Sequence, residues 1–93
     1  MAMYPYLTLE DETLVTHSHL KEKDGIKIVE VHFERPKPYG FDMVRIDLPS
    51  YKLIMRDGYS DEEIEEFKSF SARHAHNFFY YAEIGGVPIA EAI

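Results

Sequence analysis

Histidines at alternate positions in the first half of the chain have a spacing that could hold a metal ion. His17 and His19 are two residues apart, as are Glu30 and His32. Side chains two apart on a β-strand point to the same face, and zinc binds imidazole and carboxylate groups. The candidate metal ligands are therefore His17, His19, Glu30 and His32. The alternative interpretation is a solvated sheet face on which Glu30 forms an ion pair with Arg45.

The remaining polar residues do not form a recognisable catalytic motif. No serine has the neighbours of a known nucleophile motif, and the chain lacks a glycine-rich phosphate loop. Six acidic residues occur between Asp57 and Glu66 without a basic one. They fall mostly on an exposed helix start, whereas paired acid and base catalysis needs burial to separate two pKa values. We therefore predict no catalytic residue and no bound cofactor, apart from the possible divalent metal.

Four consecutive aromatic residues, from Phe78 to Tyr81, would surround a helix on all sides. A sheet can cover only one side of that helix, here Phe78 and Tyr81. Phe79 and Tyr80 then need another neighbour, either a second segment of the same chain or a second subunit. Aromatic side chains are enriched at interfaces, so Phe79 and Tyr80 are candidate contacts of a homodimer.

The elements that would position these residues begin with strands. Apolar residues alternate with polar ones over residues 4–9, 14–20, 26–33 and 41–48. Asp24-Gly25 is a strong signal for a two-residue hairpin turn. A hairpin at this turn pairs Leu20 with Val29, Ser18 with Val31 and Thr16 with Phe33. The next hairpin is expected to pair Val31 with Val44, and Val29 with Ile46. This register gathers the apolar residues on one face and leaves His17, His19, Glu30 and His32 on the other.

A long helix is predicted over residues 61–83. Ser60 and Glu63 have the spacing of a capping box, and Gly85-Gly86 follows the last apolar residue of the helix. The role of residues 51–56 is open between a strand and a helical turn, and that of residues 87–93 between a loose end and an added strand. The expected fold is a single α+β domain over 1–93, a four- or five-stranded antiparallel meander with one long C-terminal helix packed on one face.

Composition narrows the possible partners. The chain of 93 residues has a net charge of -7 and no cysteine. Without clustered basic residues we expect no binding to nucleic acid, and without a long apolar run we expect no membrane association. The absence of cysteine favours a cytoplasmic location over a secreted, disulfide-linked one.

Several short stretches carry a family resemblance: Tyr4-Pro5-Tyr6, His17-Ser18, the run from Val29 to Pro36, Gly40-Phe41-Asp42, Leu48-Pro49-Ser50-Tyr51, Gly58-Tyr59-Ser60 and Gly85-Gly86. Through them the chain resembles an uncharacterised group of short hypothetical proteins from gut anaerobic bacteria. The resemblance implies no established activity.

The sequence therefore favours a small acidic, non-catalytic protein-binding or interaction module. Its acidic helix start and an exposed edge strand could engage a basic protein partner or a second copy of the chain. The alternative is a metal-binding protein, or a small metal-dependent enzyme, that uses the His/Glu cluster on the open sheet face.

Overall fold

The computed structural model describes residues 3–88, in which six strands precede one long helix. The elements are β1 (Met3–Thr8), β2 (Leu14–Ser18), β3 (Lys21–Lys23), β4 (Ile26–Lys37), β5 (Gly40–Leu48), β6 (Lys52–Asp57) and α1 (Asp61–Ile84). The expected α+β class is confirmed, with six strands instead of four or five. Most of the segment left open at residues 51–56 belongs to β6, and the tail at 89–93 lies outside the described residues.

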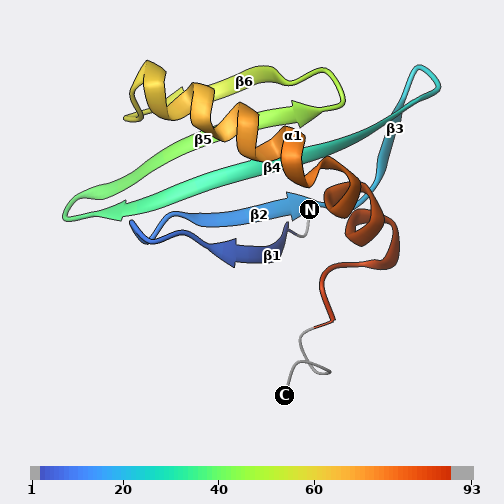
Figure 1. Cartoon of the computed structure of the whole chain (residues 1–93), viewed down its shortest axis with the longest axis horizontal. Helices are drawn as coiled ribbons and strands as arrows, with labels where there is room; N and C mark the ends of the chain where they lie inside the picture. The colour runs from blue at the N-terminus through green and yellow to red at the C-terminus, as the bar shows by residue number, and fades with distance from the viewer. Residues whose placement is uncertain (1–2, 89–93) are drawn as a thin grey trace.

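The sheet is antiparallel and follows the order β1-β2-β4-β5-β6, while β3 pairs with the first part of β4. The helix α1 runs diagonally across one face of this sheet, and no second layer built from the described residues covers the other (Figure 1). Asp24 and Gly25 have φ angles of 53° and 80° in the turn between β3 and β4. These positive angles fit the predicted two-residue hairpin.

The core lies between α1 and the middle of the sheet. The predicted alternation in β4 and β5 is confirmed, because every second residue there is fully buried beneath the helix: Val29, Val31, Phe33, Val44, Ile46 and Leu48. From the helix, Phe67 stacks on Phe33 with ring centroids 4.2 Å apart. Stacked aromatic pairs add to the free energy that burial itself provides.

The predicted register between β4 and β5 is wrong by two residues. Val29 pairs with Leu48 and Val31 pairs with Ile46. The cause is the position of the connecting turn, because Lys37 pairs with Gly40 and the turn is centred one residue later than the predicted register requires. A shift of two residues keeps every side chain on its predicted face, since faces alternate with a period of two.

The predicted register between β2 and β4 is wrong by one residue, which does change faces. His17 pairs with Val31, where the sequence predicted Ser18. In β3 the expected register returns, since Lys21 pairs with Ile28. One extra residue therefore lies among residues 18–20, which face only Val29 and Glu30 of β4. This irregularity lets His17 lie fully buried under the helix while Leu20, further along, also packs against the core and donates its backbone N–H to Ala82.

The predicted helix termini are confirmed to within a residue. Ser60 accepts a hydrogen bond from the backbone of Glu63, whose side chain accepts one from the backbone N–H of Ser60. This capping box satisfies donors that the first helical turn would leave unpaired. At the other end Gly85 has a φ of 89° and donates its N–H to Tyr81. Among the described residues, no helix has the length and apolarity needed to cross a membrane.

Candidate functional site

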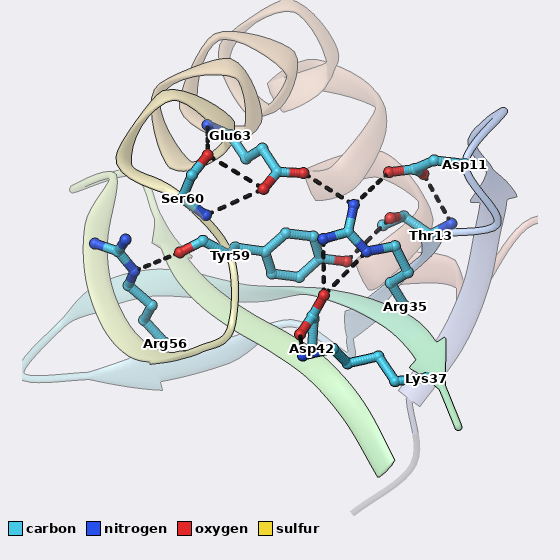
Figure 2. A network of polar contacts seen from close by, with 9 residues as sticks. All are labelled: Asp11, Thr13, Arg35, Lys37, Asp42, Arg56, Tyr59, Ser60 and Glu63. Carbon is cyan, nitrogen blue, oxygen red and sulfur yellow. Dashed lines mark hydrogen bonds and ion pairs between the residues drawn. The ribbon is translucent and has the colours of Figure 1, made fainter. Parts of the chain in front are cut away.

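A guanidinium group lies among three carboxylates at the end of the sheet where α1 begins (Figure 2). Arg35 on β4 donates two hydrogen bonds to Oδ2 of Asp42, at 3.0 and 2.7 Å. Its remaining terminal nitrogen donates to Asp11 at 3.0 Å and to Glu63 at 2.9 Å. The guanidinium carbon also lies 4.5 Å from the centre of the Tyr59 ring. We call these five residues the Arg35 cluster.

Each charged group of the Arg35 cluster has an oppositely charged partner within the chain. Asp42 is almost fully buried, and its second oxygen lies 2.7 Å from Nζ of Lys37. Hydrogen bonds donated by Lys37 and Arg35 lower the pKa of Asp42, and the hydrogen bonds that Arg35 donates to Asp42 raise the pKa of Arg35. The Tyr59 hydroxyl lies 3.0 Å from Oγ1 of Thr13. Because its donors and acceptors are used within the chain, we assign this cluster a structural role in holding the start of α1 against β4 and β5.

A second group of charged residues occupies the open face of the sheet, opposite α1. Its centre is the side chain of Glu30, which is only 5% exposed. Lys21 forms an ion pair with Glu30, and Nε2 of His32 donates a hydrogen bond to it at 3.0 Å. Arg45 lies 3.4 Å from Glu30 and donates two hydrogen bonds to Asp47, at 2.9 and 3.1 Å. Burial and the nearby Arg45 lower the pKa of His32, so its imidazole is neutral at pH 7. We call these five residues the Glu30 cluster.

A hollow of about 670 Å³ adjoins the Glu30 cluster on the open face. The β3–β4 hairpin, the end of β5 and the strand β6 surround it. Ile26 and Ile54 line this hollow, and they are 57% and 42% exposed. Lys23 and Lys52 also line it, and neither forms an ion pair with another described residue. The hollow therefore combines an accessible apolar lining with two ammonium groups that form no ion pair within residues 3–88.

The four residues predicted to bind a metal do not come together. Glu30 and His32 lie on the open face as expected, but His17 faces the helix because β2 pairs with β4 in another register. His19 is exposed in the connection between β2 and β3. No group of three or more potential ligands with the geometry to hold a metal ion occurs in residues 3–88. The register that supported the predicted site is wrong.

His17 is instead part of the core. Its ring lies near Tyr4, Tyr6 and Phe78, with centroid distances of 5.6, 6.4 and 6.0 Å. Nδ1 donates a hydrogen bond of 2.9 Å to the carbonyl of Ser18, while buried Nε2 has no hydrogen-bond partner among the described residues. Burial lowers the pKa of His17, which keeps the imidazole neutral.

The two aromatic residues proposed as interface contacts have different surroundings. Phe79 packs against the core and lines a small hollow together with Leu20. It therefore has a neighbour within the chain. Tyr80 is 54% exposed, and its ring lies 5.2 Å from that of Tyr81.

Sequence reasoning placed Arg45 beside Glu30 and His32 but missed the hollow. The hollow depends on the short strand β3, which was not predicted as a separate strand, and on β6, whose segment was left open between a strand and a helical turn. In β4, Ile26 and Ile28 stand at even positions, whereas Val29 and Val31 stand at the odd positions that face the helix. These two isoleucines on the open face were a signal in the sequence for an accessible apolar lining. Comparisons with protein-family models, curated proteins and solved structures gave no match to this chain.

Proposed function

We propose that this chain is a non-catalytic protein-binding module that holds an extended segment of a partner protein on the open face of its sheet. The observation that carries the proposal is the hollow lined by Ile26 and Ile54, which are both well exposed. Accessible apolar side chains that are grouped together and rimmed by polar residues are typical of interaction sites. The Glu30 cluster beside them offers fixed polar groups that could orient a bound segment.

The chemistry of the partner segment follows from the charges around the hollow. Lys21 and Arg45 are already engaged by Glu30 and Asp47. Two cations at the hollow, Lys23 and Lys52, and one carboxylate, Glu22, have no ion-pair partner among the described residues, so positive charge is in excess. A segment with an apolar side chain next to one or two carboxylates would complement this surface, because complementary charges favour association and specificity.

A random peptide library displayed on phage provides the test. We expect selection on the wild-type protein to enrich peptides in which an apolar residue neighbours Asp or Glu. The affinity of synthetic copies should fall at least about tenfold for Ile26→Asp, since central apolar contacts dominate interface energies. Ile84→Asp is the matched control, because Ile84 is 53% exposed at the end of α1, away from the hollow.

Chemical-shift mapping of the backbone amides then locates the bound peptide. The proposal requires the largest shifts in β3, β4, β5 and β6 around the hollow, and unchanged binding for Ile84→Asp. No enrichment of peptides, or enriched peptides that bind Ile26→Asp as tightly as the wild type, would refute it.

A further inference from the structure

The strand β6 forms one edge of the sheet and has an unused side. It pairs with β5 along one side, and no described strand lies along the other. Ile54 and Met55 at its centre are 42% and 38% exposed. Unpaired backbone groups along such an edge can bind the edge strand of another chain.

An irregularity in β6 makes its pattern of faces symmetrical about its midpoint. Lys52, Met55 and Asp57 pair with Asp47, Arg45 and Met43, all on the open face. Leu53 and Arg56 pair with Ile46 and Val44, both on the helix face. Ile54 is the extra residue, and it lines the hollow on the open face together with Lys52. From Lys52 to Asp57 the faces therefore read open, helix, open, open, helix, open.

This symmetry matters because of the geometry of antiparallel pairing. Residues that lie directly opposite each other in two antiparallel strands share a face of the sheet. If a regular strand of six residues paired with a second copy of itself about its midpoint, each residue would lie opposite one whose side chain points to the other face of the sheet. The extra residue Ile54 removes that conflict, so the pattern of β6 matches a reversed copy of itself at all six positions.

We infer that two copies of this chain associate by pairing their β6 strands antiparallel, about a two-fold axis between Ile54 and Met55. In this register Lys52 lies opposite Asp57 of the second copy, and this opposite-charge pair occurs twice. Ile54 lies opposite Met55 of the second copy, so the exposed apolar side chains cover each other. The inference does not rest on the proposed peptide site, because it is argued from the edge of the sheet, although both surfaces include Lys52 and Ile54.

Charge reversal tests the register. Lys52→Glu sets two carboxylates opposite each other, and Asp57→Lys sets two ammonium groups opposite each other. We expect each variant to dimerise roughly tenfold to a hundredfold more weakly than the wild type, since two favourable pairs are replaced by two repulsive ones. A mixture of the two variants should form a heterodimer, and the double variant should dimerise like the wild type. Ile26→Asp is the control that should leave dimerisation unchanged.

The measurement is sedimentation equilibrium from about 1 µM to about 1 mM, the range in which weak dimers dissociate. Salt at about 0.15 M screens the repulsion between two chains of charge -7. Circular dichroism verifies that every variant is folded. A wild-type protein that stays monomeric over the whole range would overturn the inference. So would single variants that dimerise as well as the wild type.

Cross-linking provides a second readout that does not depend on charge. The chain has no cysteine, so introduced cysteines can react only with each other. Opposed residues in antiparallel strands have Cα separations of about 4.5–5.5 Å, within the range of a disulfide. A mixture of Lys52→Cys and Asp57→Cys should therefore cross-link under oxidation, whereas each variant alone, and a mixture of either with Ile84→Cys, should not. Equal cross-linking in all of these samples would contradict the proposed pairing.

Discussion

Two glycines with nearly the same φ angle differ in what surrounds them, and this difference allows a controlled test of the Arg35 cluster. Gly58 and Gly85 have φ angles of 93° and 89°. A Cβ atom on Gly58 would overlap Oδ1 of Asp42 and lie 2.8 Å from its Cγ. A Cβ atom on Gly85 would have no neighbour within 4 Å. We expect Gly58→Ala to destabilise the protein much more than Gly85→Ala.

The expected magnitudes follow from two separate costs. An alanine forced into the left-handed region costs roughly 1–2 kcal/mol, and this cost applies to both variants. Only Gly58→Ala adds an overlap with a buried side chain, and overpacking of that kind costs roughly 1–3 kcal/mol. The second cost separates the two variants. It corresponds to a difference in melting temperature of roughly 5–20 °C for a domain of this size.

Urea denaturation followed by circular dichroism measures both variants against the wild type. Repeating the two substitutions in an Asp42→Ala background removes the carboxylate that the new methyl group would strike. In that background most of the difference between Gly58→Ala and Gly85→Ala should disappear, since only the Cβ of residue 42, at 3.3 Å, still faces the new methyl group. Equal destabilisation by the two substitutions in the wild-type background would show that Gly58 does not pack against Asp42 as described.

Two further predictions concern the aromatic part of the core. Burial lowers the pKa of His17, so below about pH 6.5 the unfolded chain binds more protons than the folded one, and stability falls as the pH falls. His17→Gln should reduce this slope by up to one proton, at most about 1.4 kcal/mol per pH unit. Urea denaturation at several pH values measures the slope, and an unchanged slope in His17→Gln would contradict the prediction. The Tyr6 hydroxyl and Nδ1 of His74 share a hydrogen bond of 2.6 Å, so Tyr6→Phe should cost about 1 kcal/mol in thermal denaturation. Tyr4→Phe is the control, because the Tyr4 hydroxyl has no hydrogen-bond partner among the described residues, and equal losses in both variants would argue against the Tyr6–His74 bond.

Alternation predicted the faces of β4 and β5 because these strands are regular over the buried stretch. Every second residue from Val29 to Phe33 and from Val44 to Leu48 lies under the helix. An error of two residues in their register did not matter, since the period of the faces is also two. The helix start was equally predictable, because the spacing of Ser60 and Glu63 satisfies local hydrogen bonds that do not depend on distant residues.

Alternation failed where a strand contains an extra residue. Leu14 and Val15 are adjacent and both apolar, so the sequence of β2 fits either face equally well. The structure buries Val15 and His17 completely and leaves Leu14 38% exposed. The observed pairing of β2 requires one extra residue between β2 and β3. Nothing in a single sequence marks the position of such an irregularity. Glu30 and His32 were placed correctly on the open face because they belong to β4.

The net charge of the chain is a poor guide to its partner, because part of the charge is compensated locally. The acidic helix start suggested a basic partner, yet Glu63 is bound by Arg35 and Asp61 forms an ion pair with Arg56. The remaining carboxylates there are exposed, and exposed charges are screened by salt and contribute little alone. Lys23 and Lys52 differ in lying beside accessible isoleucines. At that surface, burial of apolar side chains can supply the affinity, and the two ammonium groups can supply the selectivity. We therefore expect the partner segment to be acidic although this chain is itself acidic.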